Sequence, residues 1–196
     1  MKFLSDLPIV NNGIFVYDLD IKKDHSKYYK SLEYMGTDAS SEMSIKRDVL
    51  NKVPEIKKEV HAACNHFISE ILSMECDYHI YNSWATLTKP NCDSVAHSHT
   101  NSWISGVYYP EHNKDFNITF YNDFHNFYMT KIKQFGIYNS RFFTINPQKN
   151  QLLLFFSNLR HKIDKNNSNI DRYSLAFNIL PKGDFGVEDS RVNFKF

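Results

Sequence analysis

Three histidines and one arginine carry the chemistry that this sequence suggests. His97 and His99 are separated by one residue, and His161 follows a short apolar run much later in the chain. Residues i and i+2 of a strand face the same way, so His97 and His99 can point into one cavity from a strand end. His161 can join them from another strand. Three protein ligands on a metal ion leave positions open for a substrate and O₂, as catalysis requires.

Arg172 and Ser174 lie just downstream, on one face of an expected strand. An arginine on a buried strand is costly unless it is paired. A dicarboxylate ligand could supply the partner, because guanidinium binds carboxylate in a two-pronged fork. Ser174 could donate a second bond to the same group. The alternative for Arg172 is a structural salt bridge with an internal Asp or Glu. The pattern therefore indicates a metal site with an anion clamp beside it.

Length and charge narrow the class of protein. A chain of 196 residues suits one domain, with 16 Phe and 12 Tyr available for a sheet-rich interior. We expect a single domain over residues 1–196, with helical support in 1–76 and a β core in 77–186. The net charge of +1 gives no electrostatic footprint for nucleic acid or an anionic membrane.

Cysteine usage and the apolar runs predict a location. The three cysteines are an odd number without CxxC spacing, so we expect free thiols, with Cys64 buried on a helix. The first ten residues lack the long apolar core of a signal peptide. The longest apolar run, 152–156, is too short to cross a bilayer. These features predict a soluble protein in a reducing cytoplasm.

The hydrophobic periodicity predicts helices first and many short strands after them. Asp24 can cap a helix that runs to about Met35 and stops at Gly36. A longer helix begins near Pro54 and carries an apolar stripe as far as Ile71. We expect strands at 14–19, 78–88, 103–109, 117–121, 142–145, 151–156 and 173–180, with an insertion at 122–140 that shapes a substrate entrance. This order is typical of an α+β, mainly β protein in which helices brace a sandwich or barrel.

Taken together, the ordered motifs resemble the 2-oxoglutarate/Fe(II)-dependent oxygenases, and above all a small subgroup found in bacteria and tailed phages. The resemblance covers roughly half of the chain. It is carried by Asn-Ser-Trp at 82–84, His-Ser-His-Thr-Asn-Ser at 97–102, Ser-Gly-Val-Tyr-Tyr at 105–109, Phe-Phe-Ser-Asn-Leu-Arg-His at 155–161 and Arg-Tyr-Ser-Leu-Ala-Phe-Asn at 172–178. No single motif is specific, but the ordered set is.

The resemblance implies a double-stranded β-helix (a jelly-roll, cupin-like core) with N-terminal supporting helices. It implies Fe(II) as the metal and 2-oxoglutarate as cosubstrate in the hydroxylation of an unidentified small molecule or peptide. His97 would be the proximal metal ligand and His161 the distal one. Arg172 would hold the far carboxylate of 2-oxoglutarate with help from Ser174, and Tyr109 is a further candidate for that pocket. The location would be the cytoplasm of a bacterium or of a phage-infected host cell.

The sequence departs from the usual motif of this superfamily at one ligand. The usual motif is HxD or HxE, whereas His99 stands in the carboxylate position here. Three neutral imidazoles can still bind Fe(II), with one more unit of positive charge at the site. Two other ligand sets stay open. His99 could be the proximal ligand with Asn101 or a water beside it, or Asp93 could enter from the loop.

Two other functions are compatible with the same residues. A three-histidine cupin dioxygenase would oxidise a small thiol or diketone without 2-oxoglutarate, and Arg172 would then bind the substrate's carboxylate. A non-catalytic β-barrel module would hold Zn²⁺ or no metal. Consumption of 2-oxoglutarate separates the first two functions, and metal analysis separates both from the third. We expect Trp84 and Trp103 in the core, and Tyr108 and Tyr109 on opposite faces of their strand.

Overall fold

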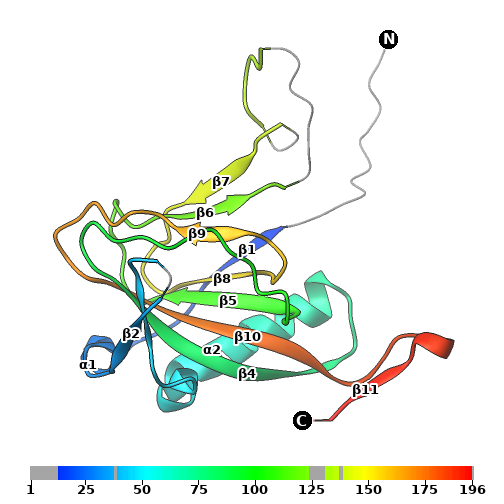
Figure 1. The fold of residues 1–196 in the computed structure, drawn as a ribbon. Helices are drawn as coiled ribbons and strands as arrows, with labels where there is room; N and C mark the ends of the chain where they lie inside the picture. The colour runs from blue at the N-terminus through cyan, green and yellow to red at the C-terminus, as the bar shows by residue number, and fades with distance from the viewer. Residues whose placement is uncertain (1–12, 38, 124–130, 137–138, 196) are drawn as a thin grey trace.

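The computed structural model describes residues 13–37, 39–123, 131–136 and 139–195. The described residues form two antiparallel sheets and a small set of helices (Figure 1). In chain order the elements are β1 (Ile14–Asp18), α1 (Ser26–Lys30), β2 (Tyr34–Gly36), β3 (Glu42–Ser44), the 3₁₀ turn η1 (Val49–Lys52), α2 (Pro54–His66), the π-helical turn η2 (Phe67–Ile71), β4 (Asp77–Thr88), β5 (Ile104–Tyr109), β6 (Ile118–Tyr121), β7 (Phe142–Ile145), β8 (Gln151–Phe156), β9 (His161–Ile163), β10 (Arg172–Phe185), the 3₁₀ turn η3 (Glu188–Ser190) and β11 (Val192–Phe194).

The large sheet and the small sheet form the double-stranded β-helix. The large sheet has the strand order β1-β8-β5-β10-β4-β3-β2, and β11 extends it by pairing with β10. The small sheet has the order β7-β6-β9. Figure 1 shows the small sheet on one side of the large sheet and α2 on the other. The large sheet is therefore covered on both faces.

Strand alternation divides the large sheet into a helix-facing side and a side that faces the small sheet. On β10, Leu175, Phe177 and Ile179 belong to the core cluster that includes the buried face of α2. The intervening residues, which include Arg172, Ser174 and Asn178, point the other way. The polar side chains of β10 are thus directed toward the space between the sheets.

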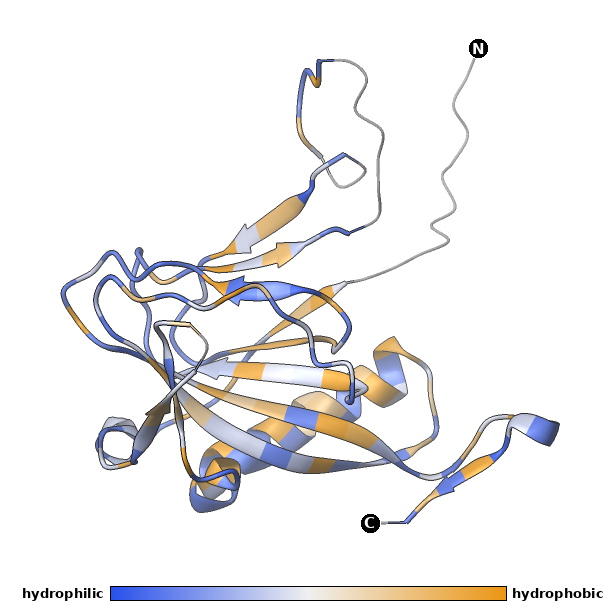
Figure 2. Cartoon of the chain, in the orientation of Figure 1, coloured by the Kyte–Doolittle hydropathy of each residue, from blue (hydrophilic) through white to orange (hydrophobic). Residues whose placement is uncertain are grey.

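Helix α2 forms where the sequence predicts it. Pro54 occupies the first turn, and Ile56, Val60 and Cys64 repeat at helical spacing and are completely buried. Figure 2 shows hydrophobic and hydrophilic bands alternating along this helix. Among the described residues, no helix is both long and apolar enough to span a membrane.

Gly106 shows how closely the strands of the core approach. It lies opposite Phe177 in the pairing of β5 with β10. A Cβ atom at this position would lie 2.1 Å from the Phe177 ring. A side chain here would force Phe177 out of the core, so the glycine permits the packing of the two central strands.

Most of the expected elements are confirmed, and one helix is wrong in extent. The strand expected at 14–19 is β1, which lies at the edge of the large sheet. The helix expected from Asp24 to Met35 is only α1 (Ser26–Lys30), and β2 follows it. The Asp24 carboxylate does accept a 2.8 Å hydrogen bond from the backbone N–H of Ser26. Tyr34 and Met35 instead pair with β3, a contact that local periodicity does not encode.

The N-terminal third is therefore not purely helical. Residues 13–76 contribute three strands to the large sheet in addition to α1 and α2. The short strands β2, β3, β9 and β11 were not expected from the sequence. Part of the insertion at 122–140, namely 124–130 and 137–138, lies outside the described residues.

Candidate metal centre and carboxylate pocket

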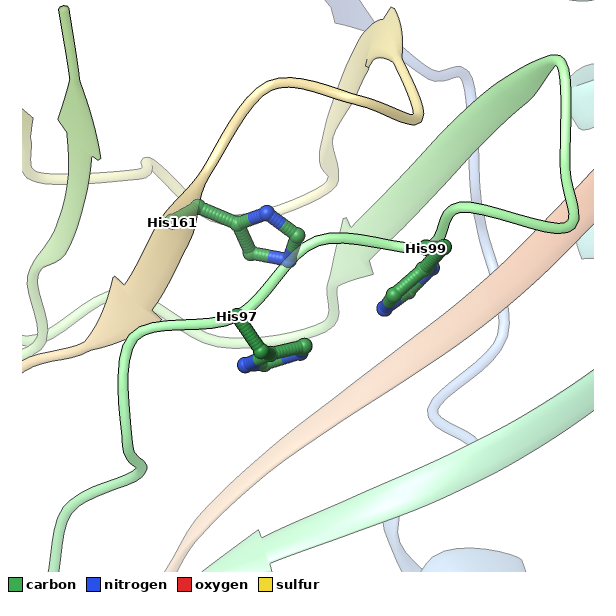
Figure 3. A group of neighbouring side chains, drawn as sticks. All are labelled: His97, His99 and His161. Carbon is green, nitrogen blue, oxygen red and sulfur yellow. The ribbon is translucent and has the colours of Figure 1, made fainter. Parts of the chain in front are cut away.

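The structure brings His97, His99 and His161 together (Figure 3). One possible ligand atom from each residue lies within 4.8 Å of the others. The ring centroids are 4.6 Å apart for His97 and His161, and 5.2 Å apart for His97 and His99. The three rings converge from two chain segments on one small volume. This separation is short enough for one metal ion to bridge all three.

Backbone pairing holds the two segments in register. His97 lies in the extended segment between β4 and β5, where its N–H and C=O form two 2.9 Å hydrogen bonds with His161 at the start of β9. The N–H of His99 donates to the carbonyl of Ser157 at 2.8 Å. His97 and His99 thus lie in an extended segment beside a strand, close to the expected strand end.

The hydrogen bonds of the imidazoles leave one nitrogen of each ring available for a metal. Nδ1 of His97 lies 2.9 Å from the carbonyl oxygen of Val95, and Nδ1 of His161 lies 2.9 Å from that of Leu159. A carbonyl only accepts, so both Nδ1 atoms carry the proton and both Nε2 atoms keep a free lone pair. Metal-bound histidines are usually oriented by such bonds from the other ring nitrogen.

His99 is oriented by side chains instead of a carbonyl. Its Nδ1 lies 2.7 Å from Oδ1 of Asn178 and 3.0 Å from Oγ of Ser105. A proton on Nδ1 satisfies the amide oxygen and leaves Nε2 of His99 free, as in the other two rings.

Burial keeps two of the three imidazoles neutral, which is the form that binds a metal. Burial lowers the pKa of His161 to about 3, against a weaker opposing effect of its bond to the Leu159 carbonyl. Burial also lowers the pKa of His99. His97 is exposed, so the site opens to solvent on the His97 side. On the closed side, the rings of Phe155 and Phe120 lie against His161, with centroids 4.8 and 5.8 Å away.

Arg172 occupies a second polar position between the sheets. It is 2% exposed, and its Nη1 donates to the Asn117 carbonyl at 2.9 Å. Its guanidinium carbon lies 5.2 Å from the ring centroid of Tyr109 and 5.5 Å from that of Phe116. Burial lowers its pKa. Among the described residues, no Asp or Glu forms an ion pair with Arg172, so the structural salt bridge considered above is not present there.

Unpaired polar atoms identify this position as a candidate carboxylate pocket. Nε and Nη2 of Arg172 and the hydroxyl of Tyr109 are buried and have no hydrogen-bond partner among the described residues. Such atoms are costly unless a ligand satisfies them. Burial raises the pKa of Tyr109 to about 12, so its hydroxyl stays protonated and can donate. Ser174 is 3% exposed and lies one alternation along β10 from Arg172. These donors could bind the carboxylate of a ligand.

The other residues singled out in the sequence lie as follows. The Asp93 carboxylate accepts a 3.1 Å bond from Ser40, and neither Asp93 nor the exposed Asn101 belongs to the described cluster of metal-binding groups. Trp103 packs against the main core as expected. Trp84 is half-buried, with its ring centroid 5.8 Å from that of His99. Trp84 is thus a neighbour of the candidate metal centre.

The two adjacent tyrosines point to opposite faces of β5, as expected. Tyr108 belongs to the cluster around α2, and Tyr109 belongs to the cluster between the sheets. Only Tyr109 can therefore line the carboxylate pocket.

Comparison of the sequence with protein families identifies the class that this fold and site define, the non-haem iron oxygenases with a β-helix core. The model of a family described as "Putative 2OG-Fe(II) oxygenase" matches residues 82–178. This range includes all three histidines and the carboxylate pocket. Over this range the chain matches the 2-oxoglutarate/Fe(II) oxygenase family, whose cofactor is Fe(II) and whose cosubstrate is 2-oxoglutarate. Curated protein sequences give no match to the chain.

Solved structures of this fold are similar over most of the chain. HygX from Streptomyces hygroscopicus, with nickel, 2-oxoglutarate and hygromycin B bound, gives a TM-score of 0.61 at 10% identity, covering 87% of this chain and 83% of that one. A prolyl hydroxylase from Trichoplax adhaerens, in complex with a hypoxia inducible factor peptide, gives 0.60 at 10% identity, covering 86% and 83%. A 2OG-Fe(II) oxygenase family oxidoreductase from Burkholderia pseudomallei gives 0.57 at 9% identity, covering 79% and 74%. Identities this low support the fold alone.

Sequence reasoning missed the residues that support the histidines and the arginine. Asn178 and Ser105 contact His99, and Asn117 and Phe116 contact Arg172. The even spacing of Arg172, Ser174 and Asn178 placed all three on one strand face, and this signal could have identified Asn178. The contacts of Asn117 and Phe116 depend on how the two sheets face each other, for which the sequence carries no local signal.

Proposed function

We propose that this protein uses the three histidines to hold Fe(II) and hydroxylates a small molecule or peptide at the expense of 2-oxoglutarate. The observation that supports this most strongly is that two sites lie beside the same face of β10, where Asn178 contacts His99 and Arg172 lies six residues before it. Three imidazoles offer free Nε2 atoms at one site, and an arginine with two unpaired nitrogens, Nε and Nη2, lies at the other. A dicarboxylate with a keto group is suited to bridge a metal and a guanidinium. Fe(II) with 2-oxoglutarate and O₂ supplies one oxygen atom for a substrate C–H bond, with release of CO₂ and succinate.

The described residues of the pocket bind and orient the cosubstrate. Arg172 would offer Nε and Nη2 as a fork to the far carboxylate, and the hydroxyl of Tyr109 would donate to the same group. Ser174 would complete this group of donors from the same strand face. Contacts of the guanidinium with the rings of Tyr109 and Phe116 would help to hold the fork in place before the ligand arrives.

The aromatic residues around the histidines would control access of water and substrate. The rings of Phe120 and Phe155 shield the inner side of His161 from water. His97 is exposed and Trp84 is half-buried beside His99, so the substrate would approach from this side. A dry inner wall and an open outer wall protect the oxidising step from side reactions while admitting substrate.

Consumption of 2-oxoglutarate tests the proposal directly. The protein is loaded with Fe(II) without O₂, mixed with 2-oxoglutarate, and exposed to air, and succinate is measured over time. We expect succinate to form slowly without added substrate, and His161→Ala and Arg172→Lys to form far less. Succinate production that does not require Fe(II), or that is equal in all three proteins, would refute the assignment.

One observation favours a second function, the three-histidine cupin dioxygenase. His99 stands where the wider superfamily has a carboxylate, and among the described residues the candidate ligand cluster contains no acidic group. An enzyme of that kind would consume O₂ with a thiol or diketone carrying a carboxylate at Arg172. It would leave 2-oxoglutarate unchanged, so the same assay separates the two functions.

A further inference from the structure

Asn178 forms the centre of a buried hydrogen-bond network beside the candidate metal centre. Its Oδ1 lies 2.7 Å from Nδ1 of His99 and accepts a 2.8 Å bond from Oγ of Ser105. Oγ of Ser105 lies 2.8 Å from Oγ of Ser157. Asn178 is 5% exposed, and the two serines are 1% and 0% exposed. Bulk water therefore has little access to this network, and its members must satisfy one another.

An amide side chain can present either of two groups to an imidazole. If Asn178 presents its oxygen, Nδ1 of His99 carries the proton and Nε2 is free to bind a metal. If Asn178 presents its NH₂ group, Nδ1 of His99 must accept, the proton moves to Nε2, and the ring offers no lone pair to the metal. His97 and His161 do not have this choice, because their Nδ1 atoms face backbone carbonyls that only accept.

The two serines satisfy Asn178 in the orientation that allows metal binding. The hydroxyl of Ser105 donates to Oδ1 of Asn178, and the hydroxyl of Ser157 can then donate to Ser105. An inverted amide would place an N–H group against Ser105 and require both hydroxyls to reverse. The direction of the serine hydroxyls is thus coupled to the group that Asn178 offers to His99.

We infer that Asn178 is a positioning residue that selects the metal-binding tautomer of His99 and so determines whether the third imidazole completes the site. This inference rests on the proposed function, in which the three histidines hold the metal. The amide of Asn178 would thus orient His99, which stands where the HxD and HxE sites of the superfamily have a carboxylate.

Substitutions at position 178 distinguish the loss of a hydrogen-bond acceptor from a change in side-chain packing. Asn178→Asp keeps the nearer acceptor for Nδ1 of His99, whereas Asn178→Ala removes it and leaves only the Ser105 hydroxyl at 3.0 Å. Asn82→Ala is the matched control, because Asn82 lies opposite Asn178 on β4 and its Oδ1 has no hydrogen-bond partner among the described residues. Co²⁺ affinity is measured by competition with a coloured chelator in the absence of O₂, and a thermal melt of each variant verifies folding.

We expect Asn178→Ala to bind Co²⁺ about 10- to 100-fold more weakly than the wild type, as is usual when the group that orients a ligand is lost. Asn178→Asp should bind within about threefold of the wild type or more tightly, because a charged acceptor strengthens the bond to His99. Asn82→Ala should bind as the wild type does. Equal affinity of Asn178→Ala and the wild type, or an equal loss in Asn178→Asp and Asn178→Ala, would overturn the inference.

The tautomer of His99 in the metal-free protein gives a readout that needs no metal. Long-range ¹H–¹⁵N spectra of the imidazole should show the proton on Nδ1 in the wild type and in Asn178→Asp. They should show it moving to Nε2 in Asn178→Ala, or in Asn178→Leu if the first variant does not fold. An Nε2 proton in the wild type would overturn the inference. A wild-type protein that binds no metal would refute the proposed function, whereas the spectra would still decide the role of Asn178.

Discussion

Replacing Arg172 with lysine tests whether its guanidinium binds a ligand carboxylate. Lysine keeps the positive charge but loses the planar fork, so a bound carboxylate loses the donors that Nε and Nη2 of Arg172 would provide. A lost hydrogen bond to a charged group costs about 1.5–3 kcal/mol, which is roughly a 10- to 150-fold rise in the dissociation constant. Titration of 2-oxoglutarate into the Co²⁺-loaded proteins without O₂ measures this difference.

The stability of the ligand-free protein should change much less. Arg172→Lys gives up one bond to the Asn117 carbonyl and contacts with two aromatic rings. It also removes two buried nitrogens, Nε and Nη2, that have no partner among the described residues, and places an ammonium with three donors in the same surroundings. The charge is kept and no described ion pair is broken, so we expect the melting temperature to shift by no more than about 4 °C. Loss of a buried ion pair would instead cost about 3–5 kcal/mol, or roughly 6–20 °C for a chain of this size.

Arg160→Lys provides the matched control. Arg160 also lies over a tyrosine ring, with 4.4 Å from its guanidinium carbon to the Tyr121 centroid, but its side chain is 43% exposed and it pairs with Asp123. Its substitution should leave 2-oxoglutarate affinity unchanged. An Arg172→Lys protein that melts far below the wild type yet binds 2-oxoglutarate normally would refute the reasoning and favour a structural role.

Three further predictions concern the histidines and the buried cysteine. His161→Ala should lose metal that the wild type retains after dialysis, and His97→Ala and His99→Ala should lose metal affinity to similar extents. His112 is the control, because its Nδ1 contacts the Pro147 carbonyl away from the cluster, and His112→Ala should bind metal as the wild type does. The metal-free protein should lose stability as the pH falls below about 6.5, because the unfolded chain protonates His161 there while burial holds its pKa in the folded protein at about 3. The loss from this residue is about 2 kcal/mol between pH 6.5 and 5, and urea unfolding of His161→Phe should lack it. The Cys64 thiol is completely buried and burial raises its pKa, so native protein should protect it from iodoacetamide far better than unfolded protein does; equal rates would contradict this.

Local patterns were sufficient to predict the main elements of the fold. The helical stripe after Pro54 and the apolar run of β8 are decided by their own residues, because burial of one face selects the period. The segment 31–36 could not be predicted in this way, since Tyr34 and Met35 form a strand only because β3 is there to pair with them. The three-residue strand β9 is likewise defined by its partners β6 and His97.

The sequence predicted the reactive side chains of the candidate site but not the residues that orient them. The spacing of His97 and His99, and the alternation of Arg172 with Ser174, indicated which side chains share a face. The partners that orient these groups come from strands far apart in sequence, as the bond between His99 and Asn178 shows. Strand order and register decide such contacts, and neither can be read from one strand alone.

The most direct test of the account is a crystal structure of the protein grown without O₂ in the presence of Fe(II) and 2-oxoglutarate. Anomalous density should show one iron bound by Nε2 of His97, His99 and His161, with 2-oxoglutarate reaching from it to the guanidinium of Arg172. Iron held by Asp93, iron absent from the three histidines, or 2-oxoglutarate bound away from Arg172 would contradict the account.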